Sequence, residues 1–216
     1  MKITIGYLYP DLLNLYGDIG NYKCLKYHLE EQGITVSTKY FDLGSKKDFK
    51  NIDILYIGSG TEENLLLALE DLKDEKNNFK KFIDDNKYLL ATGNSIEIFG
   101  KKIIKEKEIK CLGLFDYITT YGSRVVKDVC EMTSVVNDNI LGFENHSGTN
   151  NTNELIIKKH NFYGTYVIGP ILVRNPLLCS CLVRDLINQK DKKFRFKDEN
   201  YKLDREAYKI NNKDTK

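Results

Sequence analysis

Two short segments, each with a mainly apolar run that leads directly into a glycine turn, constrain the fold of this chain more than any other feature. They are NIDILYIG (51–58) and YLLATG (88–93). Runs of this length without polar alternation are typical of parallel strands covered on both faces. The segments TEENLLLALEDL and NNFKKFIDDN, which lie between the two runs, have helical patterns. Strands that alternate with helices predict a mostly parallel, doubly wound α/β sheet.

The rest of the chain fits around this sheet. Lys2 to Leu8 alternates like a strand, and Asn21 is expected to cap a helix that Gly33 ends. ITVSTKYF (34–41) is a second strand by its β-branched residues. Residues 100–172 are predicted to be rich in strands. A helix is expected from Pro176, because proline is common in the first turn.

The chain is predicted to be one domain over residues 1–189, followed by a charged helix or tail over 190–216. No repeat and no Pro/Gly/Ser-rich linker interrupts the first part. The last part is mostly charged and has few apolar anchors, so no chemistry is assigned to it.

Charge and hydropathy exclude two classes of partner. The net charge is +2, from 33 basic and 31 acidic residues, which gives no electrostatic reason to expect nucleic acid. No apolar run approaches the roughly 18–20 residues that span a bilayer. The N-terminal segment lacks the long apolar stretch of a signal peptide. We therefore expect a cytoplasmic protein without a membrane span.

The five cysteines, which include Cys179 and Cys181, are scattered and form no CxxC pair. Reduced, mostly buried thiols are the favoured interpretation, and neither a disulfide framework nor a metal site is expected. No cofactor is predicted.

Three glycine turns follow predicted strands: Gly58-Ser59-Gly60, Gly93-Asn94 and Gly169-Pro170. Sites in open α/β sheets form beyond the carboxyl ends of strands, and glycine lets backbone N–H groups approach an anion or a carbonyl oxygen. The turn at Gly93 has the strand–turn–helix pattern that in other enzymes exposes a nucleophile. Neither a dinucleotide fingerprint nor a P-loop is present.

Six segments follow one another along the chain in an order that is typical of one protein family. They are NLYGDIGN (14–21), YIGSGTEEN (56–64), LLATGNSIEIFG (89–100), LGLFDY (112–117), GFENHSG (142–148) and GTYVIGPIL (164–172). Together they resemble the class I glutamine amidotransferase domains of the cobyric-acid-synthase (CobB/CobQ) type, and among them the glutaminase subunits of lipid II isoglutaminyl synthases. The resemblance covers roughly Lys2 to Ile187. It implies a flavodoxin-like three-layer fold.

The resemblance also implies an activity. Such subunits hydrolyse glutamine and pass ammonia to a Mur-ligase-like partner, which amidates the glutamate of the peptidoglycan precursor lipid II. The family's elbow reads C-G-G-Y-Q-x-L-G, which places Gly93 at the nucleophilic cysteine and Glu97 at the glutamine. The family's histidine in G-T-Y-x-H-G-P corresponds to Ile168. Losing the nucleophile alone typically costs a factor on the order of 10⁶ in rate, so the chain is predicted to be noncatalytic.

Part of the family's binding shell is expected to remain. The turn at residues 58–60 matches one that forms part of the oxyanion and glutamine pocket, and one arginine falls near a family arginine that holds substrate. The candidate pocket residues are Gly58, Ser59, Gly60, Asn94, Arg124, Asn145 and His146. Glutamine or another small molecule is the candidate ligand.

Two other interpretations stay open. The chain could be an active glutaminase subunit in which Ser95, Thr92 or a cysteine replaces the missing nucleophile. It could instead be a small-molecule-binding module of flavodoxin-like form. The noncatalytic interpretation is favoured because the family's motifs remain while both catalytic positions differ together.

Overall fold

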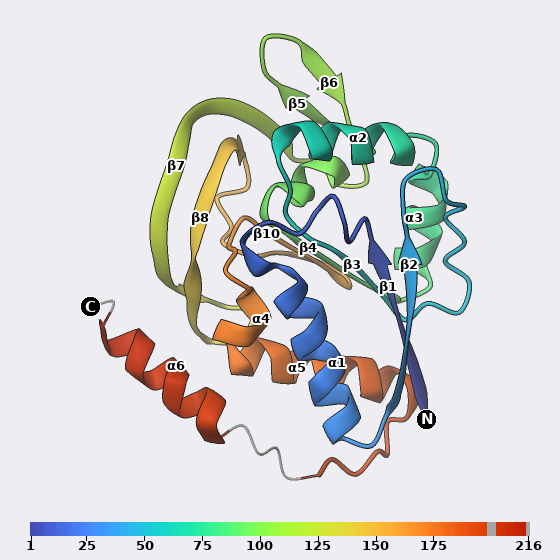
Figure 1. Ribbon diagram of the computed structural model, residues 1–216, viewed down its shortest axis with the longest axis vertical. Helices are drawn as coiled ribbons and strands as arrows, with labels where there is room; N and C mark the ends of the chain where they lie inside the picture. Colours follow the sequence, from blue (N-terminus) through green and yellow to red (C-terminus); the bar gives the residue numbers. More distant parts are fainter. Residues whose placement is uncertain (198–201, 215–216) are drawn as a thin grey trace.

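The computed structural model describes residues 1–197 and 202–214, and its centre is a six-stranded sheet (Figure 1). The strand order is β2-β1-β3-β4-β10-β9. All neighbours pair in parallel except β9 with β10. The bounds are β1 Lys2–Leu8, β2 Thr35–Phe41, β3 Ile54–Ile57, β4 Tyr88–Thr92, β9 Ile157–Lys159 and β10 Phe162–Thr165. The predicted mostly parallel sheet is confirmed.

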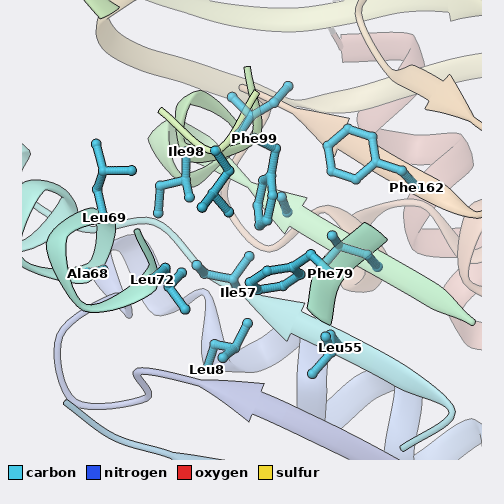
Figure 2. Close-up of a cluster of buried hydrophobic side chains, with 14 of the residues drawn as sticks. Leu8, Leu55, Ile57, Ala68, Leu69, Leu72, Phe79, Ile98, Phe99 and Phe162 are labelled. Carbon is cyan, nitrogen blue, oxygen red and sulfur yellow. The ribbon is translucent and has the colours of Figure 1, made fainter. Parts of the chain in front are cut away.

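Helices cover both faces of this sheet (Figure 1). Helices α1 (Ile19–Glu31), α4 (Ile171–Arg174) and α5 (Pro176–Lys190) pack on one face. Helices α2 (Glu62–Leu72) and α3 (Lys76–Asp84) and the 3-10 segment η2 (Gly93–Phe99) pack on the other, over the side chains drawn in Figure 2. The result is a three-layer α/β/α arrangement.

The two apolar runs are the most deeply covered strands. Every residue of β3 and β4 is buried, and the side chains contribute alternately to the two hydrophobic clusters. Leu55 and Ile57 face the α2–α3 layer, whereas Ile54 and Tyr56 face the α1–α5 layer. Period-two alternation between two apolar layers explains why the sequence of these strands shows no polar face.

A second, four-stranded sheet follows η2, with the order β6-β5-β7-β8. Its strands are β5 (Lys102–Ile104), β6 (Glu108–Lys110), β7 (Ile118–Thr133) and β8 (Asp138–Asn150). The long β7–β8 hairpin is antiparallel, with a register shift between Tyr121 and Val125. An antiparallel bridge between Phe143 and Ile168 ties β8 to the segment that follows β10. The strand-rich character expected after Gly100 is therefore confirmed.

The first helix begins earlier than the sequence suggested. Helix α1 begins at Ile19, so the prediction that Asn21 caps it is wrong. Asn21 lies inside the first turn, where its amide Nδ2 donates to Tyr56 Oη at 3.2 Å. Its Oδ1 accepts from the backbone N–H of Leu172 at 2.8 Å. Asn21 thus joins α1 to the central sheet and to α4, a role that a capping preference does not reveal.

The charged C-terminal part contains the helix α6, Lys202–Asp214. Tyr208 donates its hydroxyl proton to the backbone oxygen of Asn139 on β8, at 2.8 Å. Helix α6 therefore packs beside the second sheet, while the division of the chain at residue 189 stays a prediction. Within the described ranges, none of the helices has the length and apolar character needed to cross a bilayer.

Candidate functional site

The register of the central sheet brings the glycine turns to one edge. Ile57 pairs with Ala91, and Thr92 pairs with Thr165. Because the strands run in parallel, the turns that follow β3, β4 and β10 all leave the sheet at its carboxyl edge. This edge is where open α/β sheets form their sites.

Gly93 has the backbone geometry of an elbow but no room for a side chain. Its φ is +63°, in the left-handed region that favours glycine. A Cβ atom added there would collide with the hydroxyl of Ser59, lie 2.5 Å from Ser59 Cβ and lie 3.0 Å from Ile168 Cγ2. The side chains of Ser59 and Ile168 therefore occupy the space into which a nucleophile at this position would project.

The backbone donors of the neighbouring turn are already bonded within the protein. Ser59 N–H donates to Asp18 Oδ2 at 2.7 Å. Gly60 N–H donates to Asn94 Oδ1 at 3.0 Å, and Asn94 Nδ2 donates back to the Gly60 oxygen at 2.9 Å. The Ser59 hydroxyl also donates to Asn94 Oδ1, at 3.3 Å. An oxyanion at this turn would have to displace one of these side-chain acceptors.

Asp18, within the NLYGDIGN segment, organises the buried side of this turn. It is fully buried and accepts hydrogen bonds from Thr92 Oγ1 at 2.6 Å and Asn21 Nδ2 at 3.1 Å, besides Ser59 N–H. Burial raises the pKa of its carboxyl to about 6, although the hydrogen bonds oppose the shift. Asp18 immediately precedes α1, and its side chain joins that helix to β4 and to the turn after β3.

The two candidate replacement nucleophiles at the elbow point into the protein. The Thr92 hydroxyl donates to Asp18, away from the apex. The Ser95 hydroxyl lies close to two carbonyl oxygens, those of Thr92 at 2.9 Å and Ile57 at 3.2 Å. Both residues are fully buried. A carbonyl oxygen cannot take up a proton as a general base does, so the surroundings of Ser95 do not activate it.

His146 lies on β8 and shapes its own strand. Its Nδ1 is 2.6 Å from the oxygen of Gly148, and its ring stacks on Tyr166 with the centroids 4.1 Å apart. Its Nε2 lies 3.5 Å from Glu144 Oε2. These contacts are within the hairpin and with the segment after β10. The pocket role of His146 stays a prediction.

Glu97 was not among the pocket candidates, yet it is the most perturbed carboxyl near the elbow. It is 1% exposed, and burial raises its pKa to about 8. Tyr121 of β7 donates its hydroxyl proton to Glu97 Oε2 at 3.0 Å. At neutral pH the side chain is therefore mostly a neutral acid, and it joins η2 to the second sheet.

Arg124 and Asn145 form a separate, exposed group. Arg124 Nε donates to Asn145 Oδ1 at 2.7 Å, and Asn145 Nδ2 donates to Tyr16 Oη at 2.8 Å. Tyr16 also packs edge-on against Phe143, with the ring centroids 5.5 Å apart. The candidate residues thus do not form one cluster. Four are buried at the glycine turns, Arg124 and Asn145 lie near the surface of the β7–β8 hairpin, and the His146 side chain is buried against Tyr166.

The three-layer fold carries an elbow and glycine turns at the carboxyl edge of its central sheet. It is similar to the crystal structure of a glutamine amidotransferase, with a TM-score of 0.55 at 16% identity over 84% of this chain and 97% of that one. The family model of the CobB/CobQ-like glutamine amidotransferase domain matches the sequence of this chain over residues 4–175. The chain belongs to this family.

Two curated relatives share most of the chain. Both are the GatD subunit of a glutamine-hydrolyzing lipid II isoglutaminyl synthase. The one from Streptococcus pneumoniae (strain ATCC BAA-255 / R6) is 27% identical over 88% of this chain and 82% of its own length. The one from Staphylococcus aureus (strain N315) is 29% identical over 95% of this chain and 91% of its own length.

Proposed function

We propose that this chain is a noncatalytic glutamine amidotransferase-like subunit that associates with a Mur-ligase-like partner in the amidation of lipid II. The similarity of this chain to two GatD subunits supports its assignment to such a complex. The elbow at Gly93 supports the absence of glutamine hydrolysis. In this proposal the fold acts as a docking and stabilising element for the ligase-like subunit.

The observation that carries the proposal is the filled space beside Gly93. Thiol-based hydrolysis of an amide needs a thiolate that attacks the carbonyl carbon and a base that handles the proton. Gly93 supplies no sulfur, and Ile168 has no group that accepts a proton. Ser59 and Ile168 pack where the nucleophile's Cβ would lie. The difference from the family pattern therefore extends beyond one substituted residue to the packing around it.

The oxyanion side of the turn agrees with this. In the family the developing negative charge needs donors that are free at the moment of reaction. Here the N–H groups of Ser59 and Gly60 are held by Asp18 and Asn94. Gly58, Ser59, Gly60 and Asn94 are accordingly assigned to maintaining the turn. Arg124, Asn145 and His146 remain the candidates for contact with glutamine, another small ligand or the partner.

Covalent labelling tests the missing nucleophile. The full chain is incubated with a glutamine-analogue electrophile, with and without excess glutamine, and its intact mass is measured. We expect no adduct that glutamine suppresses. A stoichiometric, glutamine-protected adduct at Ser95, Thr92 or a cysteine would establish the alternative, an active glutaminase with a different nucleophile.

A matched variant shows that the assay can detect a restored site. In Ser59→Gly/Gly93→Cys/Ile168→His the thiol, the imidazole and the space for both are returned together. We expect glutamine-protected labelling of this triple variant at position 93, and none of Gly93→Cys alone, because Ser59 still fills the space. Equal labelling of the single and triple variants would show that the packing of Ser59 is irrelevant.

Co-expression tests the partner. The chain is produced together with the Mur-ligase-like protein of the same cell and passed over a sizing column. A stable complex of the two is expected. If they elute separately, the proposed complex is wrong, and the flavodoxin-like binding module becomes the better interpretation.

A further inference from the structure

Two helices on the far side of the sheet from η2 bring three metal-binding side chains together. Cys24 and His28 are four residues apart on α1, so they lie on the same helix face. Cys179 lies on α5, which packs beside α1 in the same layer (Figure 1). The cluster is separate from the elbow, and its argument does not depend on the proposed function.

The distances suit a tetrahedral ion. One ligand atom from each of Cys24, His28 and Cys179 lies within 4.8 Å of the others. The two sulfur atoms are 3.6 Å apart. Zinc bonds to sulfur at about 2.3 Å, which places two tetrahedral sulfur ligands about 3.8 Å apart. The sulfur pair already has this separation, and the imidazole needs a movement of only about 1 Å to complete the set.

Burial and donor type narrow the choice of metal. Cys179 is fully buried, and His28 is 8% exposed. Two thiolates and one imidazole are soft-to-borderline donors that favour Zn²⁺ over Mg²⁺ or Ca²⁺, which prefer oxygen. A carboxylate lies near as well, because Asp204 Oδ2 on α6 is 3.8 Å from His28 Nε2. Asp204 thus lies beside the imidazole, outside the set of three atoms that lie within 4.8 Å of one another.

We propose that Cys24, His28 and Cys179 bind one Zn²⁺, with a water molecule at the fourth position and Asp204 of α6 beside the imidazole. The site holds α1 and α5 together and fastens α6 to them. The site could not be predicted from the sequence, because a cysteine and a histidine one helical turn apart are not a known metal-binding motif. The third ligand is also 155 residues from the first. The expectation that the chain has no metal site is the part of the sequence analysis that this proposal replaces.

Cobalt substitution tests the geometry. The full chain is reduced, freed of metal with a chelator and titrated with Co²⁺. We expect one Co²⁺ per chain, a thiolate-to-cobalt charge-transfer band and the strong visible bands of tetrahedral cobalt, all removed by one equivalent of Zn²⁺. Zn²⁺ in large excess over its Kd is also expected to raise the Tm by about 5–10 °C.

Variants assign the ligands. Cys24→Ser, His28→Asn and Cys179→Ser are each expected to lose the charge-transfer band or weaken binding at least tenfold. Cys181→Ser is the matched control, because Cys181 lies on the same helix two residues from Cys179 and is not part of the cluster. It should bind metal like the unaltered chain. Asp204→Asn should weaken binding by about tenfold without removing the sulfur bands.

Circular dichroism of each metal-free variant identifies any that fails to fold, and the ligand assignment then relies on the variants that do fold. The proposal is overturned if the reduced chain gives no tetrahedral cobalt spectrum. It is equally overturned if folded Cys24→Ser and His28→Asn bind cobalt as tightly as Cys181→Ser does.

Discussion

The polar groups at the carboxyl edge of the sheet differ from those at the interface between α1 and α5 in what they contact. At the edge, Asp18 and Asn94 bond the N–H groups of Ser59 and Gly60, and side chains fill the space next to Gly93. At the helix interface, two thiols and an imidazole lie close together although no disulfide joins the cysteines. The elbow, where the family motif has its nucleophile, is thus densely packed and hydrogen-bonded. The side chains that could bind a metal lie instead on the other face of the sheet.

The hydrogen bonds around the elbow give it a structural role. The turn at Gly93 carries Thr92 and Asn94 on either side, and these connect β4 to Asp18 and to the turn after β3. These bonds involve no side chain at position 93. The following predictions would break or sharpen the comparison between the two regions, from the largest expected effect to the smallest.

The largest effect is expected at Asp18. Asp18→Ala leaves the buried Thr92 hydroxyl and the Ser59 N–H without their acceptor, so the free energy of unfolding should fall by about 3–5 kcal/mol. Asp11→Ala, an exposed aspartate just before the same segment, is the control and should cost less than about 0.5 kcal/mol. Urea denaturation measures both. If Asp18→Ala lowers the free energy of unfolding no more than Asp11→Ala does, the hydrogen bonds to Asp18 do not stabilise the carboxyl edge.

Packing at the elbow is tested by two glycines with similar backbones. Gly93 and Gly17 both have positive φ, +63° and +73°, but an added Cβ meets Ser59 at the first and nothing within 4 Å at the second. Gly17→Ala should cost about 1 kcal/mol from the backbone alone. Gly93→Ala should cost about 2–4 kcal/mol because overpacking adds to that strain. If thermal or urea unfolding gives the same loss of stability for both variants, the space beside Gly93 is not filled by Ser59.

The buried acid Glu97 should make stability depend on pH. Its folded-state pKa is raised from 4.5 to about 8, so the folded chain binds this proton more tightly than the unfolded chain. Its contribution is therefore fully present below about pH 4.5 and is lost as pH rises through 8. Glu97→Gln removes the dependence, so we expect the variant to gain about 4 kcal/mol relative to the unaltered chain between pH 5 and pH 9.

The control for this pH series is Glu63→Gln, an exposed residue of α2. It makes the same change of side chain at an exposed position, so it measures the effect of the substitution itself. A pH dependence for Glu97→Gln no larger than that for Glu63→Gln would show that the pKa of Glu97 is not raised in the folded protein.

The smallest effect is expected at Arg124. Its side chain is exposed and its bond to Asn145 lies at the surface, so Arg124→Ala should change the free energy of unfolding by less than about 0.5 kcal/mol. If the residue contacts the partner or a ligand, the effect should appear in binding instead. Calorimetry of the co-expressed complex and urea denaturation of the chain alone separate the two.

The sheet could be predicted because its pattern is local. The mainly apolar runs of β3 and β4, the helices between them and the proline that opens α5 are each fixed by short segments with strong preferences. Asn21 shows the limit. An asparagine near a helix start looks like a cap, but its partners Tyr56 and Leu172 come from distant parts of the chain.

The site could be predicted only in outline. The positions of Gly93 and Ile168 in the family motifs pointed to a missing pair. The packing of Ser59 against Gly93 depends on the register of β3 and β4, which sequence spacing does not give. The carboxyl of Glu97 is buried by the second sheet, and the α1–α5 cluster depends on how two helices pack. These are tertiary features, and no short segment contains them.

The central claim is that this chain does not hydrolyse glutamine. The most direct measurement is ammonia release from glutamine by the purified chain, alone and in complex with its ligase-like partner, beside a GatD subunit from Staphylococcus aureus under the same conditions. The account predicts no release above the background of the mixture without protein in either state. Release by this chain at a rate comparable to that of GatD would contradict it.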